Sequence, residues 1–311
     1  MRFVLVASAF AFVFSPVAAV AIQDALPNEE KAYGELHGRI VARVRLWPDM
    51  APGETNALRG RFSYDAGAKA WMRQDVTCPE LVVFRPTDIR SDTFLVDLPG
   101  GGYLAEYLGT NFITDKKIIE SGRWLGILFY RVPRRPGRPI NAAPREDLQR
   151  AVRWLRAHAA EYGWSSEKIG TIGYSAGGNL SVLSAVSSTD RIYEPVDAMD
   201  GISPHLNFAV AVYPAYLLDD GETDRNRNRG DGARLLPELK FDNRTPPMLL
   251  IHGDDDVYSS MGSVLLYAEL HRRRVPAQLM VFSGASHGLN DKVNVRSWRQ
   301  SLLDWLESRG L

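Results

Sequence analysis

Three short segments of this 311-residue chain carry the residue types that could together activate a serine hydroxyl. The first, Gly173-Tyr174-Ser175-Ala176-Gly177, matches the pattern G-x-S-x-G. Its glycines let neighbouring backbone approach a tight strand-to-helix turn, which presents the serine hydroxyl at the positive end of the following helix. A serine hydroxyl is a weak nucleophile until a histidine accepts its proton and a carboxylate orients that histidine. Ser175 therefore needs two such partners elsewhere in the chain.

His287 is the candidate proton acceptor. It stands beside Gly288, just after an apolar run at 278–282 that predicts a final strand. In folds that carry this serine turn, the chain order is serine, acid, histidine, and each residue lies just beyond the end of a strand. We therefore expect His287 to act as the general base.

The candidate acid lies in a run of three consecutive aspartates that follows a predicted strand. Counting four residues from His252 at the strand end favours Asp256, whereas counting back from Ser263 in the next predicted helix favours Asp255. We assign Asp256 as the acid and keep Asp255 as the alternative. Consecutive carboxylates rarely converge on one ion, so the run predicts no metal site. His252 itself is expected to make a structural hydrogen bond near the acidic turn.

Acyl transfer through such a serine also needs hydrogen-bond donors for the developing oxyanion. The turn PGGGY at 99–103 follows a predicted strand and offers unhindered backbone N–H groups, with Pro99 where the HGGG-type motif has histidine. We assign Gly101 and Gly102 as donors, together with the N–H of Ala176. The turn lacks both G-x-G-x-x-G and G-x-x-x-x-G-K-[ST], so a phosphate-binding loop and a nucleotide cofactor are not predicted.

The predicted elements alternate between buried strands and amphipathic helices, as in an α/β fold. Apolar runs without polar alternation are typical of strands buried on both faces, as in a parallel sheet. They lie at 81–84, 94–96, 125–129, 169–173, 208–212, 248–251 and 279–282. Helical spacing of apolar residues predicts helices at 144–162, 179–186, 260–273 and 293–308. Polar alternation at 38–47 and 60–64 predicts antiparallel edge strands, and we expect one doubly wound domain spanning 22–311.

Composition excludes several kinds of partner and stabiliser. The 37 basic and 37 acidic side chains balance, so charge does not draw the chain toward nucleic acid or an anionic membrane. The single cysteine, Cys78, can form neither an internal disulfide nor a zinc site of several cysteines. The basic run 131–138 is broken by prolines and is predicted to be a solvated loop. The charged segment 219–234 is predicted to be an exposed loop or a lid.

The first 21 residues have the pattern of a secretory signal peptide. A short positive start at 1–2 leads into an apolar run at 3–14, and small residues at 19–21 favour cleavage near Ala21. The alternative is an uncleaved anchor, because 3–22 is about long enough to span a bilayer. We expect cleavage, a secreted or periplasmic mature chain, and no membrane contact afterwards.

Longer segments around these motifs resemble secreted bacterial α/β-hydrolases. The chain is similar to the acetyl-xylan-esterase-like and feruloyl-esterase-like carbohydrate esterases (BD-FAE type), which stand near the hormone-sensitive-lipase-like esterases. The matching segments are LWP at 46–48, APG at 51–53, PGGGY at 99–103, YRVP at 130–133, KIGTIGYSAGG at 168–178, AVYPAY at 211–216, IHGDDD at 251–256 and SHG at 286–288. The chain departs from that pattern at Asn179, where histidine is expected, and at 257–259, where VYS replaces Val-Pro.

The resemblance implies a single-domain α/β-hydrolase fold with a mostly parallel sheet, no metal or organic cofactor, and hydrolysis of short acyl esters. Acetyl groups on plant polysaccharides such as xylan are frequent substrates of this group, and small esters are others. Tyr103 and Tyr107 are the candidate substrate-binding residues, and Trp47 and Tyr216 could also stack on sugar rings.

Three other functions remain as alternatives. A peptidase of the prolyl-oligopeptidase type shares the serine turn, but it usually carries a propeller domain, which the residues at 22–87 are too few to build. A short-chain lipase would keep the same catalytic residues. A non-catalytic binding protein on a hydrolase scaffold is the third, although every catalytic position is filled.

Overall fold

The computed structural model describes residues 24–109, 111–187, 190–219, 233–289 and 297–311. The signal peptide expected at 1–21 and nearly all of the loop expected at 219–234 lie outside these ranges. Within the described ranges, no helix combines the length and the apolarity needed to cross a membrane.

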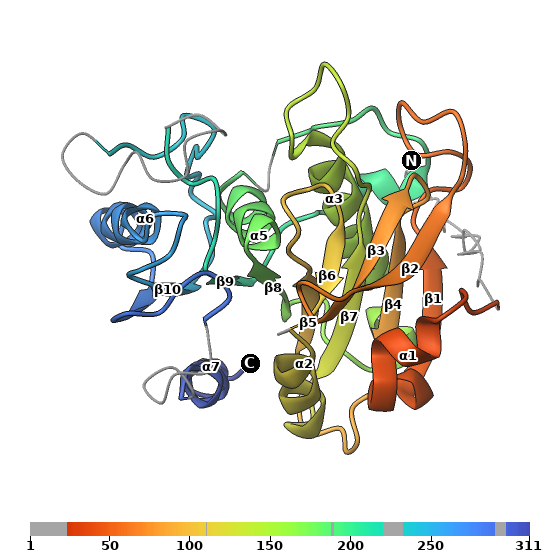
Figure 1. Cartoon of the computed structure of the whole chain (residues 1–311), viewed down its shortest axis with the longest axis horizontal. Helices are drawn as coiled ribbons and strands as arrows, with labels where there is room; N and C mark the ends of the chain where they lie inside the picture. The colour runs from red at the N-terminus through yellow and green to blue at the C-terminus, as the bar shows by residue number, and fades with distance from the viewer. Residues whose placement is uncertain (1–23, 110, 188–189, 220–232, 290–296) are drawn as a thin grey trace, which may run out of the picture.

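Eight strands form the central sheet, in the order β1-β4-β7-β5-β8-β9-β10-β11 (Figure 1). They are β1 (Ile40–Arg45), β4 (Glu80–Phe84), β5 (Phe94–Leu98), β7 (Trp124–Phe129), β8 (Ile169–Tyr174), β9 (Phe208–Val212), β10 (Met248–Gly253) and β11 (Ala277–Phe282). Every neighbouring pair from β7 to β11 is parallel. The predicted mostly parallel α/β sheet with an antiparallel N-terminal edge is thus confirmed. The run at 81–84, however, forms β4, which is antiparallel to both β1 and β7.

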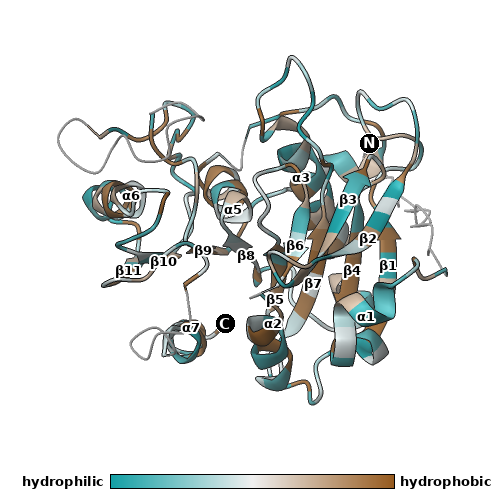
Figure 2. Ribbon diagram, viewed as in Figure 1, coloured by the Kyte–Doolittle hydropathy of each residue, from teal (hydrophilic) through white to brown (hydrophobic). Residues whose placement is uncertain are grey.

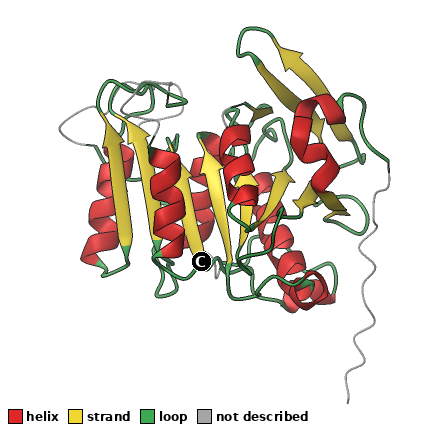
Figure 3. Cartoon of the chain, turned by 90° about the horizontal axis from the view of Figure 1, so that it is seen from below, coloured by secondary structure: helices red, strands yellow, loops and turns green. Residues whose placement is uncertain are grey.

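Helices cover both faces of this sheet (Figures 1 and 3). One layer holds α3 (Ala142–Ala157), α5 (Ala176–Val186) and α6 (Met261–Arg272), and the other holds α2 (Asn111–Glu120) and α7 (Trp298–Glu307). Each layer has its own apolar core against the sheet. Because alternate side chains of a strand point to opposite faces, strands between two such layers are apolar at nearly every position (Figure 2).

The helix predicted at 144–162 is divided in two at His158, into α3 and the short α4 (Ala159–Tyr162). Because α3 begins at Ala142, Pro144 is its third residue, where the missing N–H still has no intrahelical partner to lose. The other predicted helices correspond to α5, α6 and the described part of the last, α7, while α2 was not predicted. The small helix α1 (Glu29–Tyr33) precedes β1.

A second, three-stranded sheet has the order β2-β3-β6. It consists of β2 (Arg59–Asp65), β3 (Ala70–Val76) and β6 (Glu106–Leu108). The stretch at 60–64, expected as an edge strand, therefore belongs to this separate antiparallel sheet. An isolated bridge between Gly100 and Tyr107 joins β6 to the glycine turn that follows β5. The small sheet thus braces the turn that was predicted to supply oxyanion donors.

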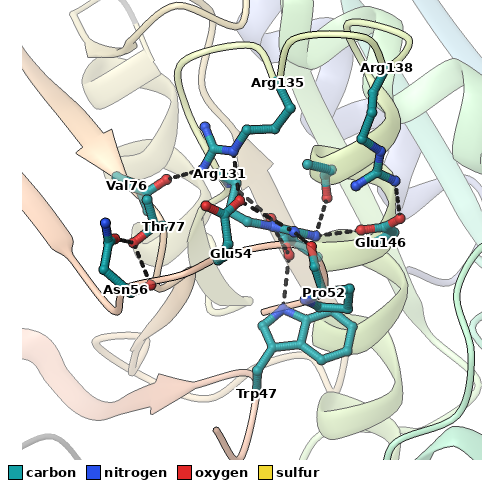
Figure 4. Close-up of polar contacts among 12 residues, drawn as sticks. Trp47, Pro52, Glu54, Asn56, Val76, Thr77, Arg131, Arg135, Arg138 and Glu146 are labelled. Carbon is teal, nitrogen blue, oxygen red and sulfur yellow. Dashed lines mark hydrogen bonds and ion pairs between the residues drawn. The ribbon is translucent and has the colours of Figure 1, made fainter. Parts of the chain in front are cut away.

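A buried ion network connects the N-terminal segment with the end of β7 and the start of α3 (Figure 4). Arg131 places Nη2 2.6 Å from Glu146 Oε2 and Nε 3.0 Å from Asp147 Oδ1. The indole N–H of Trp47 donates to the same Asp147 oxygen at 2.9 Å. Arg131 is 1% exposed, so the prediction of a solvated loop at 131–138 is wrong at this residue. Its charge is buried because two helix carboxylates compensate it.

Replacing Arg131 with methionine leaves the carboxylate of Asp147 buried without its cation. We expect Arg131→Met to lower the free energy of unfolding by about 3–5 kcal/mol, measured by urea denaturation. The matched control is Arg61→Met, because the Arg61–Asp75 pair is exposed to solvent. Losing that surface pair should cost ~1 kcal/mol or less. Equal losses in the two variants would contradict the structural role of the Arg131 network.

Candidate active site

Ser175 occupies the turn between β8 and α5, where the G-x-S-x-G pattern places it. Its φ of 54° and ψ of −115° lie in a region that residues other than glycine rarely adopt. Backbone hydrogen bonds hold this conformation: Ser175 N–H donates to Val212 O at 3.1 Å, and Ala215 N–H donates to Ser175 O at 3.0 Å. The neighbouring strand end therefore stabilises a strained residue that is 9% exposed.

The two motif glycines are required by close backbone approach. A Cβ on Gly177 would overlap the carbonyl oxygen of Leu98, and a Cβ on Gly173 would overlap the carbonyl oxygen of Gly177. Leu98 is the last residue of β5, directly before the turn at 99–103. The serine turn and the glycine turn thus pack backbone against backbone. This close contact is the steric reason for the two glycines of the sequence pattern.

Three side chains from separate loops meet in one line. His287, after β11, places Nε2 2.8 Å from Ser175 Oγ. Its other ring nitrogen, Nδ1, lies 2.8 Å and 2.9 Å from the two carboxylate oxygens of Asp256. Of the two candidate acids, the structure brings Asp256 against His287. Asp255 is exposed, and its backbone N–H donates to Ala285 O instead.

The hydrogen bonds specify which nitrogen of His287 carries a proton. A carboxylate only accepts hydrogen bonds, so Nδ1 must donate to Asp256. In the neutral ring Nε2 is then unprotonated and can accept the Ser175 hydroxyl proton. The ring packs between Tyr213 and Tyr258, with centroids 4.9 Å and 5.0 Å away. This arrangement is the one that a general base requires.

Asp256 is buried, with 1% of its surface exposed, and yet it favours the ionised form. Burial opposes ionisation, but hydrogen bonds from His252 and His287 outweigh it and hold the pKa of Asp256 below its usual value. The backbone N–H of Tyr258 also donates to Asp256 Oδ1 at 2.8 Å. A negative charge is therefore available to stabilise a protonated His287.

The glycine turn lies directly beside Ser175. A Cβ on Gly100 would come within 3.1 Å of the Ser175 Cβ. Gly101 and Gly102 follow with φ of 137° and 64°, and Tyr103 continues the left-handed run at 60°. Ala176, whose N–H is the third assigned donor, begins α5 immediately after Ser175. The assigned donors thus belong to backbone that is next to the serine, held in conformations that favour glycine.

Arg134, Tyr216 and Tyr258 link the glycine turn to the acid loop, and sequence reasoning gave none of them this role. Arg134 Nε donates to Gly102 O at 2.9 Å, and its Nη2 donates to Tyr216 Oη at 3.1 Å. Tyr216 Oη lies 3.2 Å from Tyr258 Oη, and the Tyr258 ring packs on His287. No motif predicts these contacts, because the residues come from three loops that only the fold brings together.

The predicted substrate-binding tyrosines differ in accessibility. Tyr103 is fully buried, and its hydroxyl donates to Asn179 Oδ1 at 2.7 Å, so its ring presents no free face. Tyr107 is partly exposed, and its hydroxyl donates to Asp65 Oδ2 at 2.8 Å. Trp47, also considered for sugar stacking, is 1% exposed and belongs to the core. Tyr107 is therefore the better placed of the two assigned residues to meet a ligand.

The sequence model of the prolyl oligopeptidase family (Peptidase S9) matches residues 141–309, which is more than half of the chain. The chain belongs to this family. The match covers α3, the serine turn, Asp256 and His287, and the family was among the alternatives drawn from the sequence. Within the described residues of this family member, no group of three His, Cys, Asp or Glu side chains is arranged to hold a metal ion.

Several named relatives of this prolyl oligopeptidase family member are esterases. Esterase LipC of Mycobacterium tuberculosis is 24% identical over 78% of this chain and 64% of its own length. An acetylxylan esterase of Xylanibacter ruminicola is 24% identical over 74% of this chain and 48% of its own length. The chain spans about a third to two thirds of the curated relatives that it matches.

A solved structure shares the fold. The acetyl ester-xyloside bifunctional hydrolase of Caldicellulosiruptor lactoaceticus superposes with a TM-score of 0.65 at 22% sequence identity. The superposition covers 86% of this chain and 96% of that one. The predicted α/β-hydrolase fold is confirmed by this likeness and by the sheet described above.

Behind the glycine turn, this prolyl oligopeptidase family member buries a pair of carboxyl groups. Asp97 in β5 and Asp115 in α2 are 0% and 1% exposed and lie close enough to influence each other's ionisation. Burial of two neighbouring carboxyl groups opposes a negative charge on both. Burial raises the pKa of Asp97 to about 7. Burial and the neighbouring charge of Asp97 raise the pKa of Asp115 well above its usual value.

This pair should make stability depend on pH. In the unfolded chain both carboxyls lose their protons near pH 4, whereas the folded chain retains the proton of Asp97 to about pH 7. The free energy of unfolding should therefore fall as pH rises from 4 through 7. Asp115→Asn removes one of the two carboxyl groups whose pKa is raised by burial, so its melting temperature should fall less between pH 5 and pH 8 than that of the wild type. The exposed control, Asp304→Asn, should follow the wild type. Parallel curves for Asp115→Asn and wild type would contradict a raised pKa at Asp115.

Proposed function

We propose that the chain is a serine carboxylesterase that hydrolyses short acyl esters through an acyl-enzyme. The observation that carries this proposal is the line from Ser175 Oγ through His287 to Asp256, with contacts of 2.8 Å at each step. The line lies beside a glycine turn whose backbone packs on the serine turn. A hydroxyl, a correctly oriented imidazole and a buried carboxylate next to glycine amides are the parts that acyl transfer needs.

In the first half-reaction, Ser175 Oγ attacks the ester carbonyl carbon while His287 Nε2 takes the hydroxyl proton. The resulting oxyanion accepts hydrogen bonds from the N–H groups of Gly101, Gly102 and Ala176. Asp256 stabilises the imidazolium and keeps its ring in place without taking the proton. When the intermediate collapses, the bond from the carbonyl carbon to the alkoxy oxygen breaks, and His287 gives its proton to the leaving alcohol.

The second half-reaction uses the same groups on the acyl-enzyme. A water molecule gives one proton to His287 Nε2 as its oxygen attacks the acyl carbon. Collapse of the second tetrahedral intermediate breaks the bond to Ser175 Oγ, and His287 returns the proton to the serine. Each turnover consumes one water, releases an alcohol and an acid, and leaves the enzyme unchanged.

For the substrate, we propose acetyl esters, with acetylated xylan as the polymer. Two similarities support this class: an acetylxylan esterase among the relatives and an acetyl ester-xyloside hydrolase that shares the fold. The partly exposed ring of Tyr107 beside the glycine turn is available to pack against a sugar. The pattern of a signal peptide at 1–21 favours a secreted or periplasmic enzyme, where such polymers occur.

Cleavage of peptide bonds is the second candidate, and the family match favours it. The same serine, histidine and aspartate would carry that reaction, with an amine in place of the alcohol as leaving group. The difference lies in the substrate and not in the catalytic residues, so only a comparison of substrates separates the two.

Removing either end of the catalytic line should abolish turnover without unfolding the chain. We expect Ser175→Ala to reduce hydrolysis of p-nitrophenyl acetate by about 10⁴-fold or more, because the nucleophile is lost. Asp256→Asn should reduce kcat by about 10³-fold or more, because an amide no longer selects the reactive tautomer of His287. Asp255→Asn is the matched control and should stay within about threefold of the wild type. Full activity in folded Ser175→Ala would refute the proposed mechanism.

The substrate class is tested with acetyl, butyryl, octanoyl and feruloyl esters, acetylated xylan and an aminoacyl amide. The proposal expects the largest kcat/KM on acetyl esters and release of acetate from xylan. A preference for the octanoyl ester would indicate a lipase, and a preference for the amide would indicate a peptidase. Either result would replace the proposed substrate while leaving the serine mechanism in place.

A further inference from the structure

Asp256 is contacted by two histidines, and the mechanism above uses only one of them. His252, the second, lies near the end of β10 and is fully buried. Its Nε2 lies 3.4 Å from Asp256 Oδ2 and 3.0 Å from the carbonyl oxygen of Tyr258. Its Nδ1 lies 2.8 Å from Ser263 Oγ, on α6. The ring therefore stands between a helix hydroxyl and the carboxylate that faces His287.

The partners of His252 determine its protonation. A carbonyl oxygen only accepts, so Nε2 must carry a proton and donate toward Tyr258 O and Asp256. In the neutral ring Nδ1 then has a free lone pair, and the Ser263 hydroxyl donates to it. Ser263 is itself fully buried, so no water competes for this hydrogen bond. The carbonyl oxygen of Tyr258 and the carboxylate of Asp256 thus select the tautomer that points an N–H at the acid loop, and the helix hydroxyl supports the ring from its other side.

Hydrogen bonds on two sides hold the turn that carries Asp256, and His252 supplies those on one side. On one side of this turn, the Tyr258 N–H donates to Asp256 Oδ1 at 2.8 Å. On the other side, His252 holds Asp256 Oδ2 together with the carbonyl oxygen of Tyr258. The Tyr258 ring in turn packs against His287, with centroids 5.0 Å apart. His287 is restrained by the carboxylate of Asp256 and by the ring of Tyr258. Both restraints therefore depend on the buried imidazole of His252.

We infer that His252, held in place by its hydrogen bond with Ser263, is a positioning residue for the esterase proposed above. Its N–H fixes the Asp256 carboxylate toward His287 and takes up part of the negative charge of that carboxylate. The proton that leaves Ser175 never reaches His252, so this residue acts through Asp256 alone. The inference rests on the proposed function for its kinetic consequences, but the hydrogen bonds that it describes exist without substrate.

The pH dependence of the contact between His252, Asp256 and His287 also involves the titratable groups around it. Asp256 and His287 themselves titrate. Against His287 lie the rings of Tyr213 and Tyr258. Asp254 and Asp255 are exposed at the start of the same turn, where Asp254 Oδ1 accepts the N–H of Gly284. Because these two carboxylates face solvent, water and salt screen their effect on His287 far more than that of buried Asp256.

The decisive variants are His252→Phe, which removes the donor, and His252→Gln, whose amide can place an N–H near the position of Nε2. We expect His252→Phe to lower kcat on p-nitrophenyl acetate by about 10-fold with little change in KM, because a hydrogen bond to a charged group is lost. The acid limb of kcat/KM should move to higher pH, since a carboxylate with one donor fewer holds the proton on His287 more strongly. His252→Gln should recover most of kcat and the wild-type pH profile.

The matched control is His271→Phe on the exposed surface of α6, which should behave as wild type. If His252→Phe does not fold, Ser263→Ala tests the same inference, because it removes the hydrogen bond that holds the His252 ring against α6 and so weakens the contact of the ring with Asp256. It should shift the acid limb in the same direction. A folded variant with the kcat and pH profile of the wild type would overturn the inference. The inference would also be overturned if both His252 variants lost kcat while the acid limb of kcat/KM stayed in place, because that result indicates a packing role only.

A spectroscopic measurement separates failure of this inference from failure of the proposed function. The Nδ1–H of His287, donated to Asp256, should give a far-downfield proton resonance in the substrate-free protein. His252→Phe should move that resonance and His271→Phe should leave it in place. If the wild type cleaves none of the esters, the resonance still reports on His252. If the wild type is active and the resonance ignores His252, the inference alone is refuted.

Discussion

The close backbone contact between the serine turn and the glycine turn is the constraint on which the rest of the site depends. Gly177 has no room for a side chain because the carbonyl oxygen of Leu98 lies against its Cα. This contact brings the end of β5 against the start of α5, directly beside Ser175, whose φ is positive. The nucleophile and the amides beside it are therefore positioned by the same backbone packing.

Parallel strand order places the remaining groups. β8 lies near the middle of the central sheet, and β10 and β11 lie on the same side of it. The carboxyl ends of parallel strands share one edge of a sheet, so the loops that follow β8, β10 and β11 converge there. Ser175, Asp256 and His287 come from these three loops. The acid and the base are 31 positions apart, and the serine is 112 positions from the histidine that contacts it.

The sequence was most informative where steric necessity leaves a local pattern. Glycine spacing pointed to Ser175, and a His-Gly pair after the last strand pointed to His287. Spacing could not separate Asp255 from Asp256, because both follow the same strand and only the path of the turn decides which one is buried. β6, with three residues, is too short to leave a pattern, and β3 mixes polar with apolar residues. Arg131 seemed to lie in a solvated loop because its carboxylate partners, Glu146 and Asp147, belong to a later helix.

The hydroxyl pair of Tyr216 and Tyr258 has a consequence for how the two halves of the site stay in register. Through Arg134, this pair connects the carbonyl oxygen of Gly102 with the loop that carries the acid. A displacement of either tyrosine would therefore be transmitted to both loops, and would disturb the glycine amides and the imidazole of His287 together. Alignment of the two halves of the site is thus a single, shared property of this hydrogen-bonded chain.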